Sequence, residues 1–402
     1  MSAGAVRETS RLAGVGAWRG VFSAFCASLI GIGLARFAYT PLLPAIVAAH
    51  WFPASAAAYL GAANLAGYLA GALLGRRLAA RLSTPAVIKS MMVLATLTFF
   101  ASAVPVSFLW FFVWRFASGL AGGVLMVLAA PAVLAHVPAA QRGRAGGMIF
   151  MGVGIGVVAS GTLIPLLLKA GLGWTWVGLG GLSLLMTAMA WQGWPSDSHP
   201  GATVPGHHPH PHPFGILRAL YAEYALNAAG LVPHMIFLVV FVARGLGEGL
   251  RMGALYWVLF GIGATFGPLG VGHLADKIGF RAALRLAFLI EAVAVLAPAF
   301  THAQLALGVS SIVVGAFTPG IVPLVLGRLH ELMPHHPAEQ KAAWSRATVA
   351  FALFQAGGAY GLSFVFAHGG GYGVLFVIGA AALALALAID LAAGAVQRWA
   401  VS

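Results

Sequence analysis

Twelve apolar segments of helical length follow one another along the chain, separated by short connections. A helix needs about 20 predominantly apolar residues to cross the hydrocarbon core of a bilayer. Only 8% of the residues are charged, against roughly 25% in an ordinary soluble domain, so most of the surface must face lipid. The pattern predicts an all-α membrane protein with transmembrane helices over 19–48, 54–75, 86–104, 107–134, 145–168, 174–191, 216–243, 251–272, 284–300, 303–327, 344–367 and 372–392.

The basic residues alternate between the two sides of this predicted topology. If the N-terminus is inside, most of the 22 Lys and Arg residues lie in inner segments, and the outer loops hold only Lys169, Arg244 and Arg251. This bias is the positive-inside pattern of a multi-pass membrane protein, and it predicts that both termini are cytoplasmic. The net charge of +13 therefore does not indicate a nucleic-acid partner, which would require one solvated basic patch.

A stretch rich in proline and histidine divides the predicted helices into six and six. We expect an N-terminal six-helix bundle over 1–191, a cytoplasmic linker over 192–215 and a C-terminal six-helix bundle over 216–402, because dense proline is incompatible with a continuous helix. His207, His208, His210 and His212 could bind a metal ion, but neither a carboxylate nor a thiolate adjoins them to complete a site. A solvated linker is therefore favoured, and we expect no metal and no other cofactor.

The short loop after the second predicted helix of each half has a related sequence. Gly71–Arg77 in the first half corresponds to Gly272–Ile278 in the second, and the second copy resembles the loop signature of the major facilitator superfamily. We expect Asp276 to pair with a basic residue or with a neighbouring helix N-terminus and so to latch one conformation on the inner side. In the first-half copy Gly75 stands at the Asp position, so its latch must be weaker or replaced. The residues of the second-half latch are Gly272, Asp276, Lys277, Gly279 and Arg281.

Three further stretches, 31–44, 63–73 and 344–360, are similar to the YbfB/YjiJ-type branch of that superfamily. The resemblance implies two pseudo-symmetric bundles that alternate access to a midplane site. No GxSxG, HExxH or GxxxxGK[ST] pattern occurs, so we expect neither an enzyme nor ATP-driven transport. We expect a monomeric, multi-pass protein of a bacterial cytoplasmic (inner) membrane.

Ionisable residues inside the predicted helices are candidates for function, because a charge in lipid is expensive. Arg36 in the first helix is suited to hold a substrate carboxylate with two parallel hydrogen bonds, and a structural ion pair is the alternative. Neutral amides at helical spacing can bind a substrate or join helices to one another. The candidate substrate-binding residues are Arg36, Tyr39, Asn64, Tyr68, Asn227 and Gln355.

The seventh predicted helix carries a polar stripe. Glu223, Asn227, Gly230 and His234 fall at i, i+4, i+7 and i+11, which is one face of a helix. These side chains either line a central cavity or pack against another polar helix. The side chains of Glu223 and His234 can each bind and release a proton. Together with the buried Arg115 they are candidates for proton coupling. The neighbouring Pro233 suggests a kink or a gate.

The combined pattern favours a secondary transporter that moves a small organic solute by alternating access. Arg36 favours an anionic solute, and Glu223 with His234 favours proton coupling. The expected partners are this solute, protons and the lipid bilayer. The alternatives are an efflux pump for amphipathic or drug-like compounds, a metal-handling membrane protein that uses the histidine linker, and a sensor or scaffold that transports nothing.

Overall fold

The computed structural model describes residues 17–196, 214–334, 336–369 and 371–399, in which all regular secondary structure is helical. Most of the predicted linker, including its four histidines, lies outside the described residues. Within the described ranges no group of three or more His, Cys, Asp or Glu side chains is arranged to hold a metal ion.

The helices of the first half are a helix over 17–28, the π-helix η1 (Leu29–Leu34), α2 (Tyr39–Ala48), α3 (Ala54–Arg81), α4 (Thr84–Ala101), α5 (Phe108–Leu134), the 3-10 helix η2 (Ala139–Gln141), α6 (Arg142–Leu167), the 3-10 helix η3 (Leu168–Ala170) and α7 (Leu172–Ala190). The helices of the second half are α8 (Phe214–Gly230), the π-helix η4 (Pro233–Phe237), α9 (Leu238–Val240), the π-helix η5 (Phe241–Gly245), α10 (Gly249–Ile278), α11 (Phe280–Phe300), α12 (Gln304–Leu332), α13 (Pro337–Ala367) and α14 (Tyr372–Trp399).

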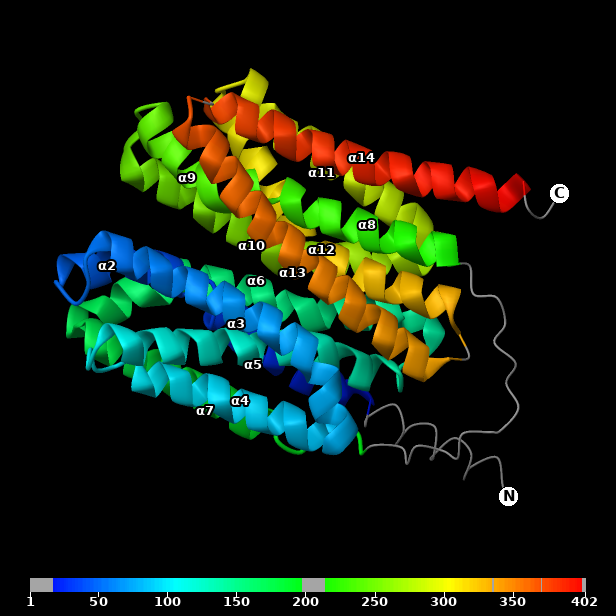
Figure 1. The fold of residues 1–402 in the computed structure, drawn as a ribbon, viewed down its shortest axis with the longest axis horizontal. Helices are drawn as coiled ribbons and strands as arrows, with labels where there is room; N and C mark the ends of the chain where they lie inside the picture. Colours follow the sequence, from blue (N-terminus) through cyan, green and yellow to red (C-terminus); the bar gives the residue numbers. More distant parts are fainter. Residues whose placement is uncertain (1–16, 197–213, 335, 370, 400–402) are drawn as a thin grey trace.

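The all-helical membrane fold predicted from the apolar segments is confirmed. Eleven helices in the described ranges are long and apolar enough to cross a membrane. The 28-residue α3 packs closely against α5 and lies alongside the others in Figure 1. It corresponds to the second predicted span and completes the set of twelve.

Two of the predicted spans are broken rather than continuous. The first passes from the helix over 17–28 into η1, and residues 35–38 form turns before α2 begins. The seventh leaves regular α-helix after Gly230 and continues through η4, α9 and η5. Pro233 has no backbone N–H to donate, which explains the second break. The sequence signalled a kink at Pro233 but gave no sign of the break at 29–38.

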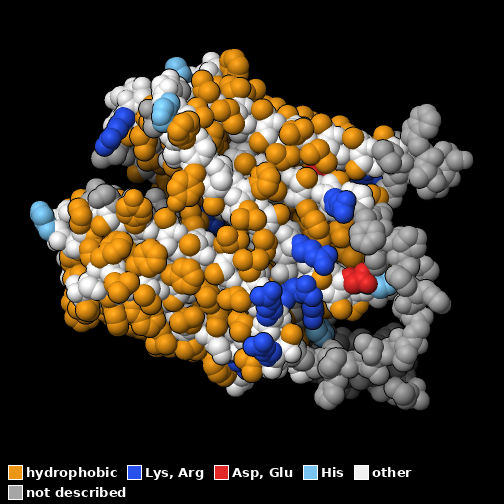
Figure 2. All heavy atoms as spheres, in the orientation of Figure 1, with side chains coloured by type: hydrophobic (Ala, Val, Ile, Leu, Met, Phe, Trp, Pro, Cys, Tyr) orange, Lys and Arg blue, Asp and Glu red, His pale blue; other side chains and the backbone are white. Residues whose placement is uncertain are grey.

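Figure 1 shows two groups of helices side by side, with α2–α7 in the lower group and α8–α14 in the upper group. At the right of the view α3 and α10 end and α13 begins, and Figure 2 shows most of the visible Lys and Arg side chains there. We call this the basic end. At the opposite edge Figure 2 shows the surface hollowed between the two groups.

Candidate functional site

Arg36 lies in the break of the first helix and reaches the other half of the molecule. Its Nη2 donates a 2.6 Å hydrogen bond to Oε1 of Gln355, which is 319 residues away on α13. The Gln355 side chain is buried, and its Nε2 lies 3.5 Å from Sδ of Met235 in η4. Two of the predicted substrate-binding residues, one from each half, are therefore in direct contact.

Aromatic rings surround the Arg36 guanidinium. Its Cζ lies 5.6 Å from the ring centroid of Phe37 and 5.8 Å from that of Tyr68 on α3, both within cation–π range. The Phe37 ring in turn lies 6.4 Å from that of Trp257 on α10. The Trp257 indole N–H is buried and has no acceptor among the described residues. Arg36 thus lies in an apolar, donor-rich region where α3, α10 and α13 approach the first helix.

Arg115 on α5 supports the broken segment that carries Arg36. Its Nη1 donates a 2.9 Å hydrogen bond to the carbonyl oxygen of Ala35, and its Cζ lies 4.3 Å from the ring centroid of Tyr39. The Tyr39 hydroxyl donates to the carbonyl oxygen of Ala57 at 2.7 Å. Asn64 Nδ2 donates to the Arg115 carbonyl oxygen at 3.3 Å. In this conformation Tyr39, Asn64 and Arg115 hold α2, α3 and α5 together, whereas Tyr68 faces Arg36.

The polar face of α8 points into the second half of the molecule. Asn227 Nδ2 donates a 2.6 Å hydrogen bond to Glu291 on α11, and His234 Nε2 lies 2.7 Å from the Ser310 hydroxyl on α12. The His234 ring also packs on Phe376 of α14, with 5.3 Å between the ring centroids. The sequence left open whether this stripe lines a cavity or meets another polar helix, and the structure has it packed against α11, α12 and α14.

Glu223 belongs to the same buried face but lies nearer the basic end. Only 2% of its surface is exposed. The charged groups within electrostatic reach of its carboxyl group are Asp390, Arg328, Arg281 and Arg285. Its electrostatic surroundings are therefore those of α11, α12 and α14 rather than those of Arg36.

The Asp276 carboxylate bridges the two halves at the basic end. Its Oδ1 accepts a 2.8 Å hydrogen bond from the backbone N–H of Gly143, and its Oδ2 accepts one of the same length from Arg144. Both donors belong to the first turn of α6, where free N–H groups and the helix dipole favour a negative charge. The sequence allowed two partners for Asp276, a basic side chain or a helix N-terminus. In the structure Asp276 binds the N-terminus of α6.

The other residues of the predicted latch divide into contact and turn positions. Gly272 lies against Gly143 so closely that an added Cβ would stand 2.1 Å from the Gly143 carbonyl oxygen. Gly279, at a φ of 84°, forms the turn between α10 and α11. Lys277 is exposed, and Arg281 Nε lies 3.5 Å from Asp390 Oδ1 on α14. Arg281 thus binds α11 to α14 within the second half.

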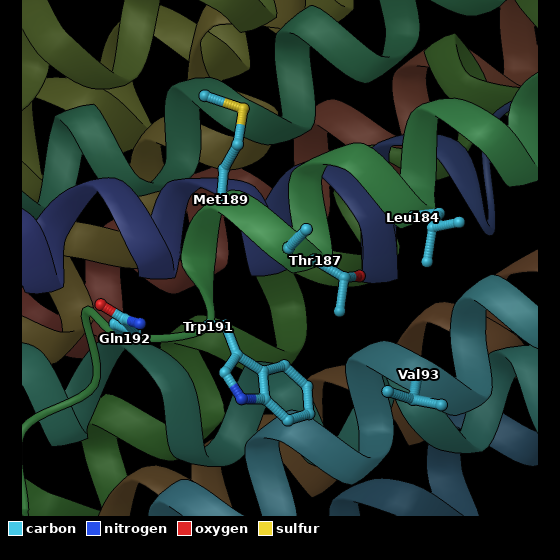
Figure 3. Close-up of a pocket in the computed structure, with 7 residues that line it drawn as sticks. Val93, Leu184, Thr187, Met189, Trp191 and Gln192 are labelled. Carbon is cyan, nitrogen blue, oxygen red and sulfur yellow. The ribbon is translucent and has the colours of Figure 1, made fainter.

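A pocket between α4 and α7 lies apart from all these residues. Figure 3 shows Val93 on α4 and Leu184 and Thr187 on α7 around it, with Trp191 just beyond the end of α7. Its lining is apolar apart from neutral Thr187 and Gln192, and it contains no ionisable side chain. Lys89 on α4 borders the pocket without lining it, with its Nζ 5.1 Å from the ring centroid of Trp191.

Residues 28–391 match the model of a protein family described as "Uncharacterised MFS-type transporter YbfB". The chain belongs to this family. It is therefore a multi-pass transporter of the major facilitator superfamily and not an enzyme. No curated protein matches the chain.

Solved structures of other major facilitator transporters share the fold. The proton:xylose symporter XylE, bound to 6-bromo-6-deoxy-D-glucose, has a TM-score of 0.74 at 15% identity over 92% of this chain and 94% of that one. The human organic anion transporter MFSD10 gives 0.73 at 15% identity over 93% and 99%. The E. coli fucose:proton symporter FucP gives 0.70 at 16% identity over 92% and 98%. Family and fold together make this chain a secondary transporter.

One sequence signal that bears on the site of this YbfB-type transporter is the distribution of its acidic residues. Of the nine Asp and Glu residues, only Glu8 and Asp197 precede Glu223, so the whole membrane region of the first half lacks a carboxylate side chain. Arg36 and Arg115 therefore have no carboxylate partner within the membrane region of their own half. This asymmetry is readable from the sequence alone, although attention to individual motifs misses it.

Proposed function

We propose that this transporter carries a small organic anion, whose negatively charged group binds Arg36 between the two halves. The observation that carries the proposal is the partner of Arg36. A guanidinium remains charged even when it is buried, yet the hydrogen-bond acceptor that it meets is the neutral amide of Gln355. A bound carboxylate would supply the missing negative charge and could accept two parallel hydrogen bonds.

The position of Arg36 also suits alternating access. Its contact with Gln355 joins the first helix to α13, so the groups proposed to bind substrate belong to halves that must separate and re-form around it. The first helix is interrupted at Arg36, and α13 carries the polar Gln355 at this point. Irregular backbone is tolerated at membrane depth where it borders a solute site. The organic anion transporter among the structural neighbours is consistent with this substrate class.

We further propose that transport is coupled to protons through Glu223, His234 and Arg115. The first two are ionisable groups buried in the membrane region of the second half, where an uncompensated charge is costly. Two of the structural neighbours, XylE and FucP, are proton symporters. In this proposal a change of protonation inside the second half alters how that half packs against the first.

The arrangement in the membrane is part of the same proposal. The basic end would face the cytoplasm of a bacterium, because Lys and Arg concentrate on the inner side of multi-pass proteins. The first helix begins and α14 ends at this end of the molecule (Figure 1). Both termini would then be cytoplasmic, with 192–215 linking two six-helix domains, and the protein would act as a monomer in the inner membrane.

Uptake by proteoliposomes tests the proposal. The purified protein is given a panel of labelled organic acids, with and without an inward pH gradient. Arg36→Gln should lower the apparent affinity for the transported acid roughly ten- to a hundred-fold, the value of a hydrogen bond to a charged group. The apparent affinity of Arg36→Lys should lie between those of the wild type and Arg36→Gln, because lysine keeps the positive charge but cannot form the two parallel hydrogen bonds.

The matched control is Arg244→Gln, which removes an exposed arginine far from Gln355 in the sequence. Its transport should equal that of the wild type. If Arg36→Gln takes up the acid with the same apparent affinity as the wild type, the anion site is refuted. If the rate of uptake is the same with and without the pH gradient, proton coupling is refuted. If cells that express the wild type and cells that express Arg36→Gln both become more tolerant of drugs, and to the same degree, efflux of amphipathic compounds would be favoured.

A further inference from the structure

Asn227 and Glu291 form a fully buried polar pair between α8 and α11. Both residues have 0% of their surface exposed. Asn227 Nδ2 donates a 2.6 Å hydrogen bond to Glu291 Oε2. The other oxygen of each side chain, Asn227 Oδ1 and Glu291 Oε1, is buried without a hydrogen-bond donor among the described residues. Two acceptors on the same pair are thus left unsatisfied, which is unusual and costly in a protein interior.

One proton satisfies both of these oxygens. A protonated Glu291 carries a hydrogen on Oε1 that can donate to Asn227 Oδ1, while Asn227 Nδ2 continues to donate to Oε2. We propose that Asn227 and Glu291 are a proton-binding site, in which a neutral Glu291 and the Asn227 amide exchange two hydrogen bonds and hold α8 against α11. Loss of the proton to water leaves a carboxylate and removes one of the two bonds.

The alternative states of the pair fit less well. An ionised Glu291 would have a single donor and no exposure to water, in a membrane region where charge is expensive. Rotating the Asn227 amide by 180° leads to the same conclusion. The amide oxygen would then lie 2.6 Å from Glu291 Oε2, and two oxygens at that distance need a proton between them.

The neighbouring cations are already occupied. Arg285, six residues and about 9 Å earlier on α11, donates from Nε to Asp390 of α14, and Arg281 Nε lies 3.5 Å from the same carboxylate. Among the described residues, Asn227 provides the hydrogen bond to the Glu291 carboxyl group, which is otherwise fully buried. The described titratable and charged side chains on the helices packed against α11 are Arg218, Tyr221, Glu223 and Tyr224 on α8, Arg251, Tyr256, His273, Asp276 and Lys277 on α10, Arg328, His330 and Glu331 on α12, and Tyr372 and Asp390 on α14. His234 follows α8 in η4.

The pair lies where it can influence the break in the seventh span. Asn227 is one turn before the end of α8 at Gly230, and His234 follows in η4. The Ser310 hydroxyl that meets His234 donates to the carbonyl oxygen of Ala294, three residues after Glu291. Polar contacts centred on one stretch of α11 therefore hold the seventh span on both sides of its break. Deprotonation of Glu291 would weaken the first of these contacts and leave the second.

Infrared difference spectroscopy on the purified protein tests the site directly. The carbonyl stretch of a protonated carboxylic acid should be present in the wild type at neutral pH and disappear at high pH. Glu291→Gln should remove one component of this band, and the matched control Glu339→Gln, which alters an exposed carboxyl group on α13, should remove none. Any component that belongs to the buried Glu223 is identified by its loss in Glu223→Gln. A band that is the same in Glu291→Gln and in the wild type would overturn the proposal.

Thermal unfolding separates a proton site from a charged structural group. Glutamine is the neutral counterpart of protonated glutamate and can exchange the same two hydrogen bonds with Asn227. Glu291→Gln should therefore melt close to the wild type at neutral pH and lose the high-pH decrease in melting temperature, whereas Glu291→Ala should melt several degrees lower. A Glu291→Gln protein as unstable as Glu291→Ala would show that the native group is ionised and would also overturn the proposal.

The transport readout of the site, unlike the two measurements above, rests on the proposed proton coupling. Glu291→Gln should lose accumulation driven by a pH gradient, because it holds the neutral form permanently. If wild-type transport proves independent of protons, the proposed coupling fails, while the infrared band and the melting curves still decide whether Glu291 binds a proton.

Discussion

The two halves of the molecule meet at the basic end through two interfaces that are built differently. At one, α6 of the first half packs against α10 of the second, and Asp276 accepts two backbone hydrogen bonds from the α6 N-terminus. At the other, α13 of the second half meets α3 and α5 of the first. Its hydrogen bonds are neutral, from Trp344 Nε1 to the Met126 carbonyl oxygen at 2.9 Å and from the Ser345 hydroxyl to the Ala72 carbonyl oxygen at 3.4 Å.

The difference follows from side-chain size as much as from charge. On the α6 side, a Cβ added to Gly147 would stand 2.3 Å from the Pro268 carbonyl oxygen, so backbones touch there. On the α13 side the buried Trp344 stands between the helices, and Gly75 occupies the position that corresponds to Asp276. Small residues allow close backbone approach in membranes, where packing replaces the hydrophobic drive. We infer that the α6–α10 interface holds the basic end closed and that the α13 interface is the weaker of the two.

One measurement can rank these contributions. Cysteines introduced by Arg77→Cys on α3 and Ala282→Cys on α11, both at exposed positions, would carry spin labels whose separation reports opening of the basic end. The chain has a single native cysteine, Cys26, which is fully buried and should not react. The five substitutions below are made in this background.

Gly272→Ala should have the largest effect. The new Cβ would overlap the Gly143 carbonyl oxygen at 2.1 Å, and overpacking of this kind costs about 1–3 kcal/mol or more. The closed state should be largely lost, and the label separation should lengthen. An unchanged distance distribution would show that α6 and α10 do not limit closure.

Asp276→Asn should have the next largest effect. The amide retains one acceptor oxygen and loses the charge, so at least one bond of the charged kind, worth about 1.5–3 kcal/mol, is removed. The open population should rise roughly ten- to a hundred-fold relative to the closed one. Lys277→Gln, at the exposed neighbour, is the control and should leave the distances as they are. Shifts of equal size and opposite direction in the two variants would mean that net charge, rather than the contact with α6, matters.

Trp344→Phe should have a smaller effect on the opposite interface. It removes the indole N–H and leaves the Met126 carbonyl oxygen without this donor, a neutral hydrogen bond worth about 0.5–1.5 kcal/mol. The shift should be at most about tenfold. A shift larger than that of Asp276→Asn would reverse the ranking of the two interfaces.

Gly75→Ala should have the smallest effect. The nearest atoms to its added Cβ, on Val124 and Val127, are 3.5 Å away, which is ordinary van der Waals contact. Alanine is also the better helix former by about 0.5–1 kcal/mol. The label distances should therefore stay unchanged and the melting temperature should not fall. The contrast with Gly272→Ala, a chemically identical substitution, makes this the strictest test of the comparison.

The class of fold was predictable because lipid imposes one rule on every residue of a span. Apolar length, the distribution of Lys and Arg and the signature around Asp276 are local properties, and they led to the family and the all-helical fold that the structure has. The break at 29–38 was not predictable, because its π-helical turns contain ordinary apolar residues and glycine. It is stabilised from outside the segment by Arg115, which binds the Ala35 carbonyl oxygen.

The sequence by itself determined that this chain is a bundle of transmembrane helices in lipid, and that the membrane region of its first half contains Arg36 and Arg115 but no carboxylate. Periodicity also determined that Asn227 and His234 share a face of one span. Only the tertiary structure decided which neighbours that face meets, Glu291 and Ser310, and that Arg36 meets Gln355 across the molecule. The reason is that helical spacing fixes which side chains point the same way, whereas the rotation of each helix is set by packing against partners that lie far away in the sequence.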